Sequence, residues 1–326
     1  MIESPSKLSE MVLDARKRPT ADRLIDRFEK DCTIRGMSQG TVKVYVYNII
    51  NFNKYLEQRG LYLLDVDKDI LRDYLEFMRF DRGLNQKTVE NNFTTLSSFY
   101  EYLAYEDMLE MNPVLQVRKR YLRRYKDNTD AGQIRKLISV EEMARLINST
   151  MDARDKAIIT LFAKTGIRRK ELIALDVDDI DWMEQSIRLK PTAKRTNRTV
   201  FFDDETSFTL KRWLRVRDSR NRTCEKALFI NNRSERIQRS GVSRMIEKVA
   251  TQVGLHDPNS DRMEDHFSPH CCRHWFTTHM RRSGMPREFI QELRGDVRKE
   301  AIDIYDHIDK KELRESYLAH IPQLGV

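Results

Sequence analysis

Residues 268–296 read SPHCCRHWFTTHMRRSGMPREFIQELRGD, and residues 300–309 read EAIDIYDHID. Apolar spacing predicts helices after Pro269, after Pro286 and after Lys299. His270 and Arg273 are three residues apart, so on a helix they share one face. A proton acceptor beside a fixed cation is a combination suited to chemistry on an anion.

A second arginine lies in TGIRRKEL, residues 165–172, about a hundred positions before Arg273. Arg168 and Arg273 offer planar forks of donors that match the non-bridging oxygens of phosphate and stabilise charge on a pentavalent phosphorus. Tyr305 follows about thirty positions after Arg273. A phenol is far more acidic than an alkyl hydroxyl, so it needs only modest activation to attack phosphate. His270 is a candidate to accept or hold its proton.

These motifs resemble the tyrosine recombinase family, which includes phage integrases and Xer-type site-specific recombinases. The family pattern is His-x-x-Arg, then Leu-Gly-His, then Tyr nine residues later, preceded by a Thr-Gly-Leu-Arg-x-x-Glu-Leu box. The resemblance runs from residue 20 to about residue 320, with the motifs in the family order. It implies a mainly α fold with a small β-sheet: a helical SAM-like core-binding domain and a mixed α+β catalytic domain.

The resemblance also implies roles. Tyr305 is the expected nucleophile and forms a 3′-phosphotyrosyl link, and Glu171 orients Arg168. A lysine on a β-hairpin loop protonates the leaving 5′-oxygen in the family. The loop KPTAKRTNR, residues 190–198, lies at that place, with Lys194 the first choice and Lys190 the alternative. We expect Lys190, Arg195 and Arg198 to contact DNA.

Asp296 is the departure from the family pattern, because it stands where the family has histidine. A carboxylate cannot act as a cationic phosphate donor. We expect it to be hydrogen-bonded or ion-paired with Arg294, His270 or Arg273, and to position a donor or the Tyr305 hydroxyl rather than face the phosphate.

Each of these residues alone has an ordinary interpretation. Tyr305 could be a packed helix tyrosine, and Arg168 a salt-bridged surface arginine. His270 and His274 could bind zinc with Cys271 or Cys272. However, Cys271 lies roughly a hundred degrees around the helix from His270. The joint order of the motifs favours the recombinase, for which we expect neither a metal nor a cofactor.

The chain divides by pattern into two domains. Residues 20–111 show helical periodicity throughout, with Ser38 as a predicted N-cap and a break at Gly83, which indicates a small bundle. Residues 138–326 form the predicted catalytic domain. Its short strands are predicted over 186–190 and 198–202, and Asp203 is predicted to cap the next helix.

Residues 112–137 carry eight basic and two acidic residues, a net +6 of the chain's +8. We interpret this segment as a basic interdomain linker with a short helical start. A solvated charged face is the alternative. Charge concentrated between two domains suits a strap along a DNA backbone. The residues predicted to contact DNA here are Arg118, Lys119, Arg120, Arg123 and Arg124.

Composition sets the broader class. The sequence pI near 9.2 fits a polyanionic partner. No signal peptide or membrane-spanning run is evident, and the four cysteines are too scattered for a disulfide framework. We therefore expect a cytoplasmic protein without a membrane partner.

The expected partner is double-stranded DNA. By resemblance, a homotetramer forms on paired recombination sites, from a monomer or dimer in free solution, and residues 310–326 look like an arm that docks on a neighbouring protomer. Two alternatives remain at this point. One is a type IB topoisomerase-like enzyme that nicks and religates the same strand, and the other is a non-catalytic DNA-binding relative.

Overall fold

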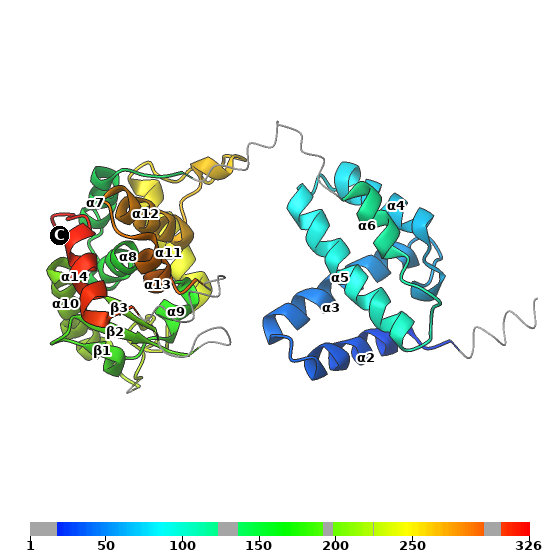
Figure 1. Cartoon of the computed structure of the whole chain (residues 1–326), viewed down its shortest axis with the longest axis horizontal. Helices are drawn as coiled ribbons and strands as arrows, with labels where there is room; N and C mark the ends of the chain where they lie inside the picture. The colour runs from blue at the N-terminus through cyan, green and yellow to red at the C-terminus, as the bar shows by residue number, and fades with distance from the viewer. Residues whose placement is uncertain (1–17, 123–135, 192–197, 224, 297–307) are drawn as a thin grey trace, which may run out of the picture. The chain divides into compact units, whose positions relative to one another are not determined.

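The computed structural model describes residues 18–122, 136–191, 198–223, 225–296 and 308–326. The chain forms two compact units that divide between residues 128 and 129, and each unit has its own hydrophobic core (Figure 1). Across these described ranges, no helix combines the length and apolarity required to cross a membrane.

The first unit is a helical bundle around a core rich in aromatic residues. Ser38 caps its second helix by accepting a hydrogen bond from the backbone N–H of Thr41 at 3.2 Å, as predicted. The helical stretch over residues 68–81 ends just before Gly83, whose φ of +56° lies in the left-handed region. The elements are α2 (Ala21–Ile34), α3 (Gln39–Glu57), η1 (Leu63–Asp65), α4 (Lys68–Glu76), the π-helical turn η2 (Phe77–Asp81), α5 (Gln86–Tyr105) and α6 (Val114–Tyr121).

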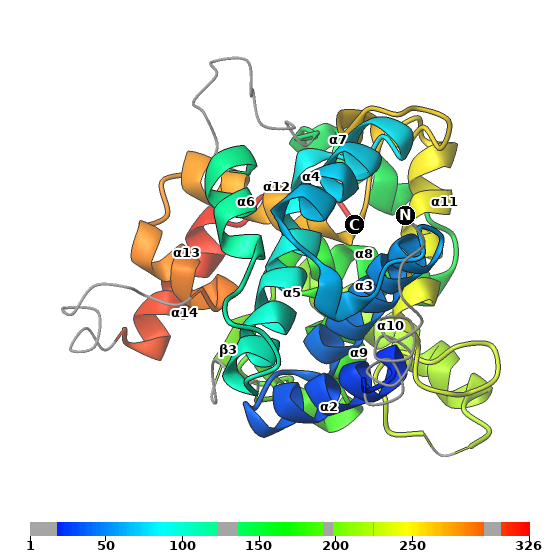
Figure 2. The ribbon, with the colours of Figure 1, turned by 90° about the vertical axis from the view of Figure 1, so that its right-hand side faces the viewer.

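Helix α6 lies within this bundle, although its residues were predicted to begin the linker. It runs alongside α5 in both views (Figures 1 and 2). Val114 and Val117, three residues apart, are buried in the bundle core, and Asn112 Nδ2 donates to the Ser97 carbonyl oxygen at 2.9 Å. The run of basic residues that directly follows Val117 conceals this apolar contact in the sequence.

The second unit surrounds helix α8, which is buried from Ala157 to Thr165 and contacts α7, α10, α11 and α12. A small antiparallel sheet in the order β1-β2-β3 covers one side, with Ser186 opposite Phe201 and Leu189 opposite Arg198. The two predicted strands and the Asp203 cap are confirmed. The elements are α7 (Val140–Asn148), α8 (Ala153–Thr165), α9 (Arg169–Ala174), η3 (Val177–Asp179), β1 (Ile180–Asp181), β2 (Ser186–Leu189), β3 (Arg198–Phe201), α10 (Asp204–Arg220), α11 (Arg239–Gln252), η4 (Met263–Asp265), α12 (Pro269–Arg282), α13 (Arg287–Arg294) and α14 (Lys310–His320).

The carboxy-terminal segment packs on its own unit rather than projecting toward a neighbouring protomer. Leu313 and Tyr317 of α14 are buried in the core of the second unit, and the Tyr317 hydroxyl donates to the Lys164 carbonyl oxygen at 3.0 Å. The Glu205 carboxylate accepts hydrogen bonds from the backbone N–H groups of residues 324–326. The expectation of an arm is therefore wrong for this conformation, because these contacts are intramolecular.

Candidate active site

Arg168 lies at the N-terminal boundary of α9, directly after the turn that ends α8. Gly166 makes this turn possible, because it has φ +59° and a Cβ there would come within 3.3 Å of Phe276 Cβ on α12. The Glu171 carboxylate accepts from the Arg168 backbone N–H at 2.6 Å and from its Nη1 at 3.2 Å. The Arg168 side chain remains 45% exposed. The motif thus fixes the backbone of Arg168 and leaves its guanidinium group accessible.

Arg273 reaches the same place from α12 and is buried. Its Nη1 donates to the Gly166 carbonyl oxygen at 2.6 Å, and its Nη2 donates to the Arg294 carbonyl oxygen at 2.8 Å. Burial, together with the nearby Arg168 and Arg294, lowers the pKa of Arg273 to about 10. That pKa is still well above neutrality, so the guanidinium group stays charged at pH 7.

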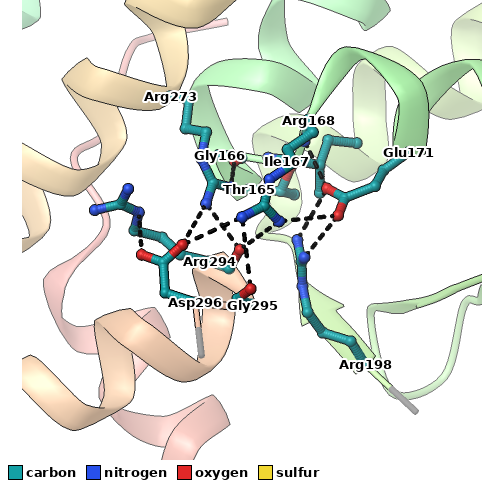
Figure 3. A network of polar contacts seen from close by, with 10 residues as sticks. All are labelled: Thr165, Gly166, Ile167, Arg168, Glu171, Arg198, Arg273, Arg294, Gly295 and Asp296. Carbon is teal, nitrogen blue, oxygen red and sulfur yellow. Dashed lines mark hydrogen bonds and ion pairs between the residues drawn. The ribbon is translucent and has the colours of Figure 1, made fainter. Parts of the chain in front are cut away.

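The C-terminal end of α13 faces both arginines (Figure 3). Gly295 ends the helix with φ +63°, and the Asp296 N–H closes the turn on the Gln291 carbonyl oxygen at 3.1 Å. The freed carbonyl oxygen of Arg294 accepts from Arg168 Nη1 at 3.1 Å as well as from Arg273. The negative end of a helix dipole therefore adds to the attraction for these two cations.

Asp296 joins the two arginines. Its Oδ1 lies 3.2 Å from Arg168 Nη2 and 3.2 Å from Arg273 Nη2, and its Oδ2 lies 3.1 Å from Arg294 Nε. The ion pairs with Arg273 and Arg294 agree with the chemistry expected of this carboxylate. The pair with Arg168 was not expected. The carboxylate thus faces the arginine pair directly.

Arg198, expected to contact DNA, instead makes a buried ion pair with Glu171. Its side chain is 7% exposed, and its Nη1 and Nη2 donate to the two Glu171 carboxylate oxygens at 2.8 and 3.1 Å. A Cβ at position 295 would lie 2.8 Å from Arg198 Cδ, so only glycine leaves room for this arginine. A basic residue in a strand next to a polar loop gave no signal that it would be buried.

The two histidines considered as zinc ligands lie on a different side of helix α12 from the two cysteines. His270 and His274 are exposed, whereas Cys271 and Cys272 are buried. No cluster of three or more potential metal ligands occurs among the residues that the structure describes, so the zinc alternative has no ligand set there. His270 keeps the accessible position that a proton acceptor requires.

Several predicted residues lie outside the described ranges: Tyr305, Lys194, Arg195, Arg123 and Arg124. Lys190, the alternative proton donor, is described and forms an ion pair with Asp176. Tyr317, the other tyrosine near the C-terminus, is buried, and burial raises its pKa well above the usual value. Its engaged hydroxyl makes it a structural tyrosine rather than a second nucleophile.

Residues 114–121 of the basic segment form α6 of the helical unit. Lys119 and Arg120 are exposed, and Arg118 Nη2 donates to Thr94 Oγ1 at 3.3 Å. Arg118 and Lys119 line an open groove of about 540 Å³, in which Lys87 is paired with Glu90 at 3.5 Å. The other lining residues are Asn91, Thr94 and Leu122. This groove presents cations and an amide from two helices on one surface.

Comparison with known families decides the class of the chain. The model of the phage integrase family matches residues 128–312, more than half of the chain. The chain belongs to the phage integrase family. The model of the phage integrase N-terminal SAM-like domain also matches residues 24–110. The fold class and the tyrosine recombinase resemblance expected from the sequence are thereby confirmed.

Relatives of this family member are tyrosine recombinases. It is 28% identical over 301 residues to XerC of Thermodesulfovibrio yellowstonii, covering 84% of this chain and 94% of the relative. It is 28% identical over 290 residues to XerC of Vibrio cholerae serotype O1, and the match covers 87% of this chain and 88% of the relative. It is 24% identical over 295 residues to XerD of Oceanobacillus iheyensis, covering 89% and 94%. The chain is an enzyme of the tyrosine recombinase type.

Solved structures share the fold. The XerH recombinase bound to its difH substrate superposes with a TM-score of 0.61 at 20% identity, covering 97% of this chain and 89% of XerH. A lambda integrase (75–356) dimer bound to a COC′ core site gives a TM-score of 0.63 at 18% identity, covering 88% and 98%. At these identities the likeness supports the fold alone.

Proposed function

We propose that the chain is a site-specific recombinase that cuts and rejoins duplex DNA through a 3′-phosphotyrosyl intermediate on Tyr305. The observation that carries the proposal is the convergence of two guanidinium groups, from α9 and α12, on a single anionic oxygen. Two planar donors aimed at one oxygen suit the non-bridging oxygens of a phosphodiester and the charge that builds on them during displacement.

The proposed reaction takes its residue roles from the family likeness. The Tyr305 oxygen attacks phosphorus, the phosphorus–5′-oxygen bond breaks, and a free 5′-hydroxyl remains. His270 takes or holds the phenol proton, and Lys194 supplies the proton to the leaving oxygen. The 5′-hydroxyl of a partner strand then attacks the phosphorus of the phosphotyrosine and gives up its proton. The bond from phosphorus to the Tyr305 oxygen breaks, and the phenol regains its proton. One phosphodiester is exchanged for another through a covalent intermediate, so the balance requires no ATP.

Several features support a double-stranded DNA partner. The α5–α6 groove presents Lys87, Arg118 and Lys119 to solvent on the helical unit, and the whole chain carries a net charge of +8. The relatives with the same fold include recombinases solved with their DNA sites. By family likeness, we infer that four protomers assemble on two sites, and that the enzyme acts in the cytoplasm.

A suicide substrate tests this function. A nicked duplex that loses a short 5′-hydroxyl fragment after cleavage traps the covalent adduct, which denaturing electrophoresis and peptide mapping locate. Candidate sites come from DNA flanking the encoding gene and from host DNA. We expect an adduct on Tyr305 and exchange of strands between two duplexes.

The alternatives give different results in the same assays. Relaxation of supercoiled DNA by a monomer, with no exchange between duplexes, would indicate the topoisomerase-like enzyme. Tight DNA binding without any adduct at a mapped site would indicate a non-catalytic relative.

A further inference from the structure

The Asp296 carboxylate lies where the two active-site arginines converge. One oxygen, Oδ1, is 3.2 Å from Nη2 of both Arg168 and Arg273, while Oδ2 is paired with Arg294 (Figure 3). Two guanidinium groups from separate helices on one anionic oxygen is the arrangement that binds an oxyanion. In this chain, the anionic oxygen that lies between the two guanidinium groups belongs to the protein's own Asp296.

The arginines do not depend on Asp296 for their positions. Arg273 is held by the carbonyl oxygens of Gly166 and Arg294 at 2.6 and 2.8 Å. Arg168 is held by Glu171 at 3.2 Å and by the Arg294 carbonyl oxygen at 3.1 Å. These acceptors belong to the backbone or to a separate ion pair. Removing the carboxylate charge therefore leaves both guanidinium groups in place, and Asp296 acts as an occupant rather than as a support.

We propose that Asp296 occupies, in the DNA-free protein, the position between Arg168 and Arg273 that an oxyanion takes, so that a phosphate group must displace it. A phosphate and a carboxylate on the same donors would repel each other in a partly buried site. The Asp296 carboxylate therefore competes with phosphate for the two arginines, at the position where the family has histidine.

The geometry allows the exchange. The Asp296 side chain is 32% exposed and that of Arg168 is 45% exposed, so solvent and ligand reach the pair. Arg294 binds the other carboxylate oxygen, so a rotated Asp296 can keep one cationic partner while Oδ1 leaves the two arginines. The proposal extends beyond recombination, because binding of a simple phosphate ion requires neither DNA cleavage nor Tyr305.

Titration of the full-length protein with inorganic phosphate, at constant ionic strength set by chloride, tests the proposal. Asp296→Asn keeps the shape of the side chain and removes its charge. We expect the phosphate Kd to fall at least about fivefold, because two like unit charges about 4 Å apart repel by about 1 kcal/mol even at the dielectric constant of water and by more at a protein surface. Asp218→Asn, at a side chain that is 77% exposed on α10, makes the same change in net charge outside the cluster and should leave the Kd unchanged.

The proposal requires that the tighter phosphate binding of Asp296→Asn depends on Arg168 and Arg273. In an Arg168→Ala background, Asp296→Asn should give no tighter binding. Asp296→Ser provides a second neutral variant if the asparagine variant does not fold, as judged by circular dichroism. Equal phosphate affinity in the wild type and in both neutral variants would overturn the proposal. So would a gain that persists without Arg168 or that Asp218→Asn reproduces. Loss of strand cleavage in any variant bears on the proposed function and leaves this readout unaffected.

Discussion

The two guanidinium nitrogens Nη1 and Nη2 of Arg198 donate to the two carboxylate oxygens of Glu171, at 2.8 and 3.1 Å. Glu171 in turn holds the backbone N–H and the Nη1 of Arg168. Arg198 starts β3, whereas Arg168 and Glu171 belong to the start of α9. The bidentate pair therefore ties the strand after the hairpin loop to an arginine of the candidate site.

Because of this buried pair, we expect Arg198 to act as a positioning residue rather than as a DNA contact. Arg198→Ala should slow single-turnover cleavage about 10–100-fold, the range for groups that orient a catalytic side chain. DNA affinity and its salt dependence should stay close to those of the wild type, because the buried side chain cannot reach a phosphate. Arg198→Lys should recover part of the rate, since it restores a charge without the bidentate fork. If Arg198→Ala flattens the plot of log DNA affinity against log salt, Arg198 contacts a DNA phosphate after all.

The two converging arginines should matter for cleavage much more than for binding. Arg168→Ala and Arg273→Ala each remove donors to the transition state, and loss of one such donor costs about 2.7–4 kcal/mol. Single-turnover cleavage at saturating DNA measures this loss, and gel-shift titration measures affinity. Arg215→Ala, an exposed arginine on α10, is the charge-matched control. Parallel losses of cleavage and affinity in both variants would make these arginines ordinary DNA contacts. Thermal unfolding checks that removing the buried Arg273 leaves the unit folded.

Tyr305→Phe should abolish the covalent adduct and keep DNA affinity, because only the attacking oxygen is removed. Tyr317→Phe is the matched control, since it deletes a buried hydroxyl that donates to the Lys164 carbonyl oxygen. It should retain adduct formation and lower the free energy of unfolding by about 0.5–1.5 kcal/mol. Adducts that persist with Tyr305→Phe would place the nucleophile on another residue.

Neutralising Arg118, Lys119 and Arg120 together should weaken binding to all DNA sequences. Each phosphate contact that is lost should flatten the plot of log affinity against log salt by roughly 0.9. The control neutralises three exposed cations of α10: Lys211, Arg212 and Arg215. An unchanged slope in the α6 variant would assign these charges to solvent. Neutralising Arg123 and Arg124 as well then measures how much these two residues contribute to DNA affinity and to its salt dependence.

Glu205 should link stability to pH. Burial by itself would raise its pKa, but hydrogen bonds from Lys164 and from the backbone N–H groups of Leu324 and Val326 lower it overall. A carboxyl with a lowered folded-state pKa stabilises the fold fully above its unfolded value, about 4.3, and this contribution is lost as the pH falls through the folded-state pKa. Glu205→Gln should therefore reduce stability at pH 7 and have a smaller effect at acid pH.

The expected loss at pH 7 is about 1.5–3 kcal/mol, the range for hydrogen bonds to charged groups. Urea unfolding of the full chain at pH 7 and below pH 4 measures both values. Glu315→Gln, an exposed residue of α14, serves as the control. A loss that is the same at both pH values would show that the charge of Glu205 has no part in holding the carboxy-terminal residues.

The sequence by itself determined the family, the helical and mixed halves, the two hairpin strands and the caps at Ser38 and Asp203. These features depend on local periodicity, on capping side chains and on motifs whose spacing is read directly from the chain. Arg168, Arg273 and Glu171 were identified in the same way, because each lies in a short motif.

Only the tertiary structure decided which charges meet. Arg198 lies 27 positions after its partner Glu171, and Asp296 lies 128 positions after its partner Arg168, so no local pattern pairs them. Val114 and Val117 likewise place α6 in the bundle core, a contact that its surrounding basic residues conceal. Burial and ion pairing depend on packing between distant elements, and the same arginine is a surface cation or a buried anchor according to what folds over it.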